Sequence, residues 1–120
     1  MKKHTPKDRV IEISLLQDNW NGEGAVVPSD LVQKNTFKFL DCVLKTGLSW
    51  MIKPEDIVPT PYGTIELDFE SEMGLVSVEV GKDKIGFFTE FNDGDDFLSE
   101  GIPTDFRTIP SRLQEALCRL

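Results

Sequence analysis

The segment T64-I65-E66-L67-D68-F69-E70 carries the carboxylates whose type and spacing bear most directly on chemistry. Glu66 and Asp68 are two residues apart, which on a β-strand places their Cα atoms about 6.5–7 Å from each other. Paired carboxylates at such separations carry out glycoside hydrolysis, in a cleft that binds a sugar and raises the pKa of one of them. A small hydrolase that uses these sheet carboxylates is therefore one alternative function.

His4 is the single histidine, and it lies in the N-terminal segment. A Ser-His-Asp or Cys-His site needs a histidine that a third group holds in a pocket, so His4 is not expected to be catalytic. Cys42, Cys118 and His4 are too scattered to be zinc ligands. The run N92-D93-G94-D95-D96 lacks the spacing of a calcium-binding loop, and we interpret it as an exposed loop. The sequence predicts no catalytic residue, no metal site and no cofactor.

A tryptophan and two glycines lie close together in N19-W20-N21-G22-E23-G24-A25. A phosphate-binding loop usually follows a strand and often contains a lysine, whereas this stretch follows a predicted helix and has neither Lys nor Arg. We therefore interpret it as a structural turn. Gly22 tolerates the positive φ that ends a helix, Gly24 lets the chain pass close to another element, and Trp20 anchors the corner in the core.

This turn, followed by Pro28 and later by V58-P59-T60-P61-Y62-G63-T64-I65-E66-L67, resembles a pattern in small uncharacterised bacterial proteins. Those proteins have a W-[DN]-G-x-G-A turn after one helix and a P-x-P-x-G-x-I-x-L segment that leads into a sheet. The resemblance covers roughly residues 10–90. It implies a bacterial, intracellular protein, and it brings no activity with it.

Helical periodicity and end signals predict three helices. The first covers residues 7–18, where apolar residues recur at spacings of three and four. The second is long and amphipathic, with Ser29 as its N-cap and Gly47 just after its end. The third begins around Pro110-Ser111. Residues 1–7 are predicted to be a flexible tail.

Alternation with period two predicts three strands at residues 64–70, 75–80 and 85–91. Residues 48–63 contain three prolines and are predicted to be irregular, and residues 92–103 are predicted to be a flexible loop. Short turns make the strands an antiparallel meander whose apolar face holds three cross-strand rows. The rows are Ile65, Val80 and Ile85; Leu67, Val78 and Phe87; and Phe69, Val76 and Thr89.

These elements predict an α+β fold in the order α-α-β-β-β-α. An antiparallel sheet of three to four strands carries the helices on one face, the side of Ile65, Leu67 and Phe69. The chain has 120 residues, of which 39% are apolar, which suits one domain over residues 1–120. No apolar run approaches the length that crosses a bilayer, and no export signal precedes the cysteines, so a cytoplasmic location with reduced thiols is expected.

The charge is unevenly distributed along the chain. The net charge is −8, and residues 55–100 contain 13 acidic residues but only two basic ones, Lys82 and Lys84, a local sum of −11. Such a field repels phosphate backbones, so direct nucleic-acid binding is not expected, whereas a basic protein would be attracted. Solubility alone is the competing explanation for the charge.

The polar face of the predicted sheet gathers these acids. The register places Glu66 opposite Glu79, and Asp68 in a row with Phe88, while Glu90 lies further along the same face. Like charges that face each other across strands are destabilising. An exposed aromatic side chain among carboxylates suggests that other groups pack over it. Such a cover is either basic groups of the chain itself, such as Lys38, Lys45 or the N-terminal lysines and Arg9, or another molecule.

The sequence thus predicts a binding face made of Glu66, Asp68, Glu79, Phe88 and Glu90 that docks a basic protein partner. The expected function is a protein-interaction module of the antitoxin or immunity type. A plain solvated face, the small hydrolase and a small-molecule site between helices and sheet remain as alternatives. The sequence leaves the oligomeric state open.

Overall fold

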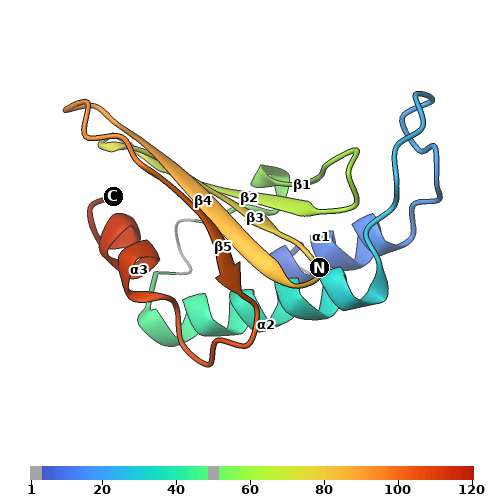
Figure 1. Cartoon of the computed structure of the whole chain (residues 1–120), viewed down its shortest axis with the longest axis horizontal. Helices are drawn as coiled ribbons and strands as arrows, with labels where there is room; N and C mark the ends of the chain where they lie inside the picture. Colours follow the sequence, from blue (N-terminus) through green and yellow to red (C-terminus); the bar gives the residue numbers. More distant parts are fainter. Residues whose placement is uncertain (1–3, 49–51) are drawn as a thin grey trace.

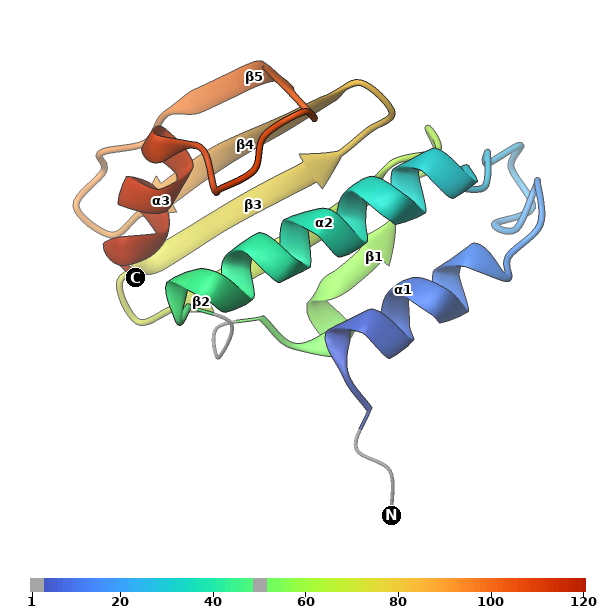
Figure 2. The same cartoon turned by 90° about the horizontal axis from the view of Figure 1, so that it is seen from below.

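A computed structural model describes residues 4–48 and 52–120 of the chain. A five-stranded antiparallel sheet forms one layer, and helices cover one of its faces (Figures 1 and 2). None of the helices in the described part of the chain is both long enough and apolar enough to cross a bilayer. The elements in chain order are α1 (Pro6–Ser14), α2 (Asp30–Thr46), the 3-10 turn η2 (Pro54–Asp56), β1 (Ile57–Pro59), β2 (Ile65–Ser71), β3 (Gly74–Val80), β4 (Lys84–Phe91), β5 (Leu98–Pro103) and α3 (Ser111–Cys118).

Helix α1 begins and ends earlier than the sequence pattern predicts. Thr5 caps its start, with the Thr5 side chain accepting a hydrogen bond from the amide of Asp8 and the Asp8 side chain accepting one from the amide of Thr5. Pro6 and Lys7 are thus helical, and the prediction of a tail over residues 1–7 is wrong for them. The helix ends at Ser14 rather than at residue 18.

The segment after α1 leaves the helix because local hydrogen bonds compete for its backbone. The Asp18 carboxylate accepts the amide of Val27, and the amide of Asn19 donates to the carbonyl of Ala25. Gly22 and Gly24 have φ values of 76° and 85°, yet they lie well past the end of α1, so the prediction that Gly22 ends this helix is wrong.

Trp20 does not anchor this corner in the core as predicted. It is half-buried, its Nε1–H lies 3.5 Å from the carbonyl of Val26, and the buried residue of the turn is Ala25. The turn 18–27 therefore holds itself together largely through its own hydrogen bonds.

Helix α2 agrees with the prediction at both ends. The Ser29 hydroxyl accepts the amide of Val32, and Gly47 adopts a left-handed φ of 77° just past the end. Its buried face lies against β2 and β3 (Figure 2). The centre of this contact is Phe39, which meets Phe69 of β2 edge-to-face at 6.2 Å between ring centroids.

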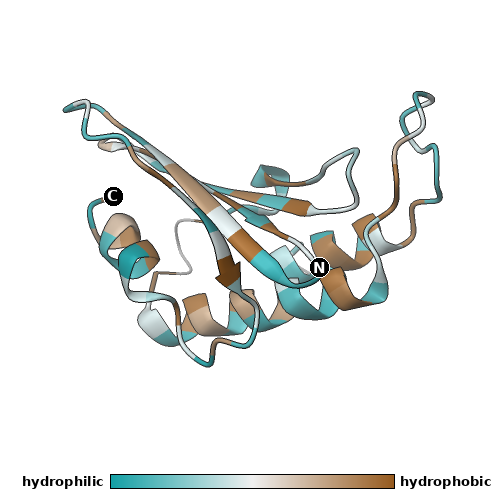
Figure 3. Ribbon diagram, viewed as in Figure 1, coloured by the Kyte–Doolittle hydropathy of each residue, from teal (hydrophilic) through white to brown (hydrophobic). Residues whose placement is uncertain are grey.

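The predicted strand registers are confirmed. The pairings Ile65 with Val80 and Val80 with Ile85 define the first of the three apolar rows, and all nine residues of those rows are buried. Apolar and polar residues alternate along the strands, as one buried face requires (Figure 3). The face that meets the helices is therefore the apolar one, and the acidic face points away from them.

Two strands were not predicted, which raises the sheet from three or four strands to five. β1 contains Pro59 and lies in the segment 48–63 that the sequence predicts to be irregular; an edge position lets it include a proline. β5 lies in the predicted loop 92–103 and pairs with β4. The strand order β1-β2-β3-β4-β5 follows the chain order.

The two cysteines have different surroundings, and both are free thiols. Cys42 is buried on α2, with its Sγ 3.5 Å from the carbonyl oxygen of Arg107, whereas Cys118 at the end of α3 is exposed. Burial raises the pKa of the Cys42 thiol, since desolvation disfavours the thiolate, and this outweighs the opposite effect of Lys45 and Lys38.

We expect iodoacetamide at pH 8 to modify Cys118 readily and Cys42 only slowly in the folded protein, because only the accessible thiolate reacts. Peptide mass spectrometry over a time course measures both rates. Denaturant should remove most of the difference. Equal modification rates in the folded protein would contradict the burial of Cys42.

Candidate functional site: the outer sheet face

The outer sheet face is the side of β2 to β5 that points away from the helices (Figure 1). It brings together all five residues of the predicted binding face, with Glu66 opposite Glu79 and Ser77 between Asp68 and Phe88. Its residues are Glu66, Asp68, Glu70, Leu75, Ser77, Glu79, Lys84, Gly86, Phe88, Glu90, Leu98 and Glu100.

Hydroxyl groups contact three of the carboxylates on this face. Ser77 is only 3% exposed, and its Oγ lies 2.6 Å from Asp68 Oδ1 and 3.1 Å from Glu66 Oε1. A serine hydroxyl has one proton, so it donates fully to one carboxylate at a time. At the neighbouring position, Thr64 Oγ1 donates to Glu79 Oε2 at 2.6 Å. These contacts orient the acids and leave them with capacity to accept further hydrogen bonds.

The basic groups proposed as an internal cover lie elsewhere. Lys38 binds the carbonyl of Thr104 at 2.5 Å on the helical side, Lys7 pairs with Asp41, and Arg9 Nε donates to the carbonyl of Ile57. Within residues 4–48 and 52–120, no salt bridge involves a carboxylate of the outer sheet face. Lys2 and Lys3 fall outside the described residues.

The negative field extends beyond the face to the η2 turn. Burial raises the pKa of Asp56, and the carboxylates of Glu55, Asp68 and Glu70 raise it further against the opposing effect of Lys53. Burial is the main cause of this shift, and the carboxylates of β2 add to it.

An apolar strip of two paired residues, Phe88 and Leu98, lies at the β4–β5 side of the acidic face. Phe88 is 37% exposed and pairs with Leu98, which is 65% exposed. The sequence pattern identifies Phe88 but not Leu98 and Glu100, because L98-S99-E100-G101-I102-P103 lacks clean alternation and is typical of a loop. The outer sheet face therefore combines this apolar strip with neighbouring acidic side chains.

The acidic run at residues 92–96 has a structural role. Arg119 of the C-terminal segment pairs with Asp95 at 2.7 Å and Asp93 at 2.9 Å, and its guanidinium lies 3.9 Å from the centre of the Phe91 ring. Asp96 accepts the amide of Phe91. In the described residues, no group of three or more His, Cys, Asp or Glu side chains is placed to hold a metal ion.

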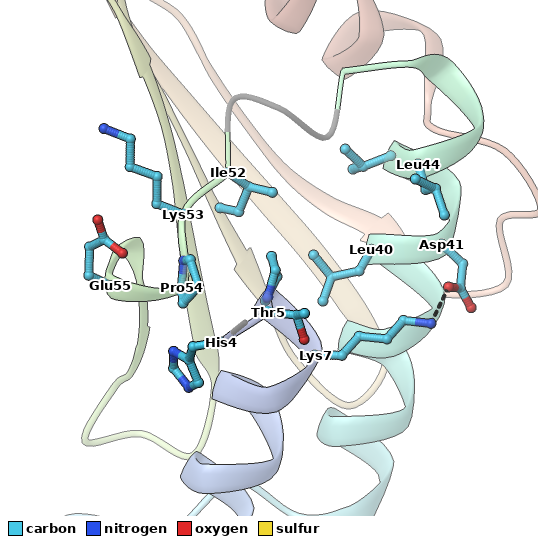
Figure 4. Close-up of a pocket in the computed structure, with 12 residues that line it drawn as sticks. His4, Thr5, Lys7, Leu40, Asp41, Leu44, Ile52, Lys53, Pro54 and Glu55 are labelled. Carbon is cyan, nitrogen blue, oxygen red and sulfur yellow. Dashed lines mark ion pairs between the residues drawn. The ribbon is translucent and has the colours of Figure 1, made fainter. Parts of the chain in front are cut away.

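A groove lies on the helical side, between helices and residues 52–55. It has a volume of about 810 Å³, and Leu40 and Ile52 point into it between the start of α1, α2 and residues 52–55 (Figure 4). Its rim includes Lys7, which pairs with Asp41 at 2.7 Å, and His4, which contacts Glu12. The His4, Lys7 and Asp41 side chains of this groove thus already have partners inside the chain, whereas a small-molecule site usually presents polar groups that converge on the ligand.

A second hollow of about 710 Å³ lies where the loops 18–29, 60–64 and 81–84 meet. Neither large hollow is lined by Glu66 or Asp68. The carboxylate pair that suggested glycoside hydrolysis instead lies on the open sheet, with both carboxylates in contact with the Ser77 hydroxyl.

The chain was compared with known proteins at the level of families, curated sequences and folds. No protein family, curated protein or solved structure matches it.

Proposed function

We propose that this chain is a protein-interaction module that docks a basic protein on its outer sheet face. The observation that carries the proposal is an acidic sheet face with an exposed apolar strip and no cover from the described part of the chain. Glu66, Asp68, Glu79 and Glu90 supply the charge, and Phe88 supplies the apolar contact.

Electrostatics and desolvation have separate roles in this docking. The carboxylates steer a cationic protein toward the face and raise its association rate, an effect that salt weakens. The apolar strip of Phe88 and Leu98 gives the contact its desolvated centre, where binding energy concentrates. Hydroxyl contacts from Ser77 and Thr64 hold three of the acids in place before a partner arrives, which lowers the entropy cost of binding.

The alternatives have weaker support. A glycosidase needs both acids of its pair in a cleft, and here Glu66 lines a small hollow of about 140 Å³ that Asp68 does not line. A small-molecule site between helices and sheet would use the groove at Leu40 and Ile52, whose rim contains the Lys7–Asp41 pair. A merely solvated acidic face explains the charge but does not explain the Phe88–Leu98 strip.

The biological setting that fits this module is a bacterial cytoplasm, where the protein neutralises a small basic protein in the manner of an antitoxin or immunity protein. The size, the acidity and the resemblance of the two turn segments support this setting. A neighbouring reading frame that encodes a small basic nuclease would strengthen it.

The test uses two triple variants that change the net charge equally. The face variant reverses three charges on the outer sheet face: Glu66→Lys, Glu79→Lys and Glu90→Lys. The control variant reverses three exposed acids elsewhere: Glu23→Lys, Asp105→Lys and Glu115→Lys. Immobilised wild-type protein captures partners from the source cells, and the captured basic protein is then purified and titrated by calorimetry. The face variant should bind it at least about 100-fold more weakly.

The control variant should keep its affinity to within about threefold, because charges away from an interface act mainly through screened, long-range fields. Binding by wild type should also weaken as salt rises. Equal affinity of the two triple variants would contradict docking on the outer sheet face, whatever protein is captured.

A further inference from the structure

A hollow interrupts the outer sheet face at Gly86. It has a volume of about 140 Å³ and is lined by Glu66, Ser77, Glu79, Gly86, Phe87, Phe88, Leu98 and Glu100. These residues come from all four strands β2 to β5, so the hollow exists only once the sheet has assembled.

Glycine at position 86 creates space rather than an unusual backbone. Gly86 lies within β4 opposite Glu79, and its φ lies outside the positive range that favours glycine. A Cβ there would lie 3.3 Å from the carbonyl oxygen of Ser99 and 3.6 Å from Glu100 Cα, which is tight but not prohibitive. Glycine in a strand interior often marks a place where another group approaches the backbone closely.

The rim of the hollow combines charge and an aromatic surface. Glu79 and Glu100 flank Gly86 on the neighbouring strands, and Glu66 shares the single proton of Ser77 with Asp68. Lys84 is the cation of this face, two residues from Gly86 along β4, and its side chain lies beside Gly101. Phe88 and Leu98 form the apolar wall.

We propose that this hollow receives an arginine side chain of the basic partner. A guanidinium is planar, stacks on an aromatic ring such as Phe88, and donates hydrogen bonds in a fork that matches carboxylates. A lysine ammonium is more strongly hydrated and offers no flat surface to the Phe88 and Leu98 wall. The inference rests on the proposed function and adds the chemistry of the central contact.

The test follows backbone amides of the whole chain by NMR during titration with three capped peptides, Ac-Gly-Arg-Gly-NH2, its lysine analogue and its neutral citrulline analogue. The arginine peptide should shift the amides of Gly86, Phe88, Leu98 and Glu100 with a dissociation constant on the order of 1 mM. The lysine peptide should bind several-fold more weakly, and the citrulline peptide should leave these amides unchanged.

Gly86→Val fills the hollow and keeps every carboxylate, and valine suits a strand. This substitution should weaken binding of the arginine peptide by about tenfold. Gly86→Ala replaces it in the test where the valine variant does not fold. Removing one charge at the rim, Glu79→Gln, should weaken binding more than Glu90→Gln, which removes one charge elsewhere on the same face.

Equal binding of the arginine and lysine peptides, or the same affinity in Gly86→Val as in wild type, overturns the arginine assignment. Failure here and failure of the proposed function give different results with the captured partner. If Gly86→Val binds that partner normally while the triple charge reversal does not, docking on the outer sheet face is supported and the arginine site in the hollow is contradicted. If the triple charge reversal has no effect on binding of the partner, docking on the outer sheet face is contradicted as well.

Discussion

Replacing Phe39 with alanine should lower the free energy of unfolding by about 3–5 kcal/mol, the loss expected for a fully buried phenylalanine. Phe39 is fully buried on α2 and joins three parts of the fold. Its ring meets Phe69 of β2 at 6.2 Å and Phe106 of the segment before α3 at 6.4 Å, both edge-to-face. The substitution leaves a cavity that separate elements would have to move together to close.

Urea denaturation followed by circular dichroism measures this loss, and Phe88→Ala is its matched control. Phe88 is also a phenylalanine in a regular element, but it lies on the outer sheet face and is 37% exposed. We expect this control to cost less than about 1 kcal/mol. Similar losses in the two variants would mean that Phe39 does not occupy the centre of the core.

Replacing Gly74 with alanine should destabilise the protein by about 2–4 kcal/mol, through backbone strain and overpacking together. Gly74 begins β3 after a tight turn and has a φ of 147°. A Cβ at this position would lie 2.4 Å from the carbonyl oxygen of Glu90 and 2.8 Å from Phe91 Cα. Both atoms belong to the backbone of the paired strand β4, so the clash can be relieved only by moving the ladder.

Gly94→Ala separates the two effects. Gly94 also has a positive φ, of 79°, but a Cβ there meets nothing within 4 Å. Thermal or urea unfolding should therefore show a loss of about 1–2 kcal/mol, from the left-handed conformation alone. A Gly74→Ala variant no less stable than Gly94→Ala would argue against the tight β3–β4 approach.

The central sheet was predictable because its periodicity was unambiguous. Ile65, Leu67 and Phe69 alternate with three acids, and a slip of one residue would bury those acids, so the register had one low-energy solution. From that register followed the positions of Glu66, Glu79 and Phe88 on the face away from the helices.

The edges of the sheet were not predictable in the same way. β5 contains Gly101 with a φ of 76°, and its register with β4 shifts between Ile85 and Phe87, so its sequence has no strict alternation. β1 is three residues long and ends in Pro59. Such edge strands form because a neighbouring strand is already in place. This is a tertiary effect, and the local sequence pattern does not reveal it. The Gly86 hollow was missed for the same reason, since β5 supplies Leu98 and Glu100.

The order of the sheet also bears on how quickly the chain reaches its fold. Each strand is hydrogen-bonded to the strand immediately before it in the chain, and α1 contacts α2, the next element along. Chain closures between successive strands are therefore short, and the entropy lost in bringing them together is small. Local strand pairing of this kind favours rapid formation of the sheet, whereas the packing of α1 on β1 and of Phe39 on Phe106 joins segments that are far apart in the chain. The sheet with its acidic face can thus assemble hairpin by hairpin.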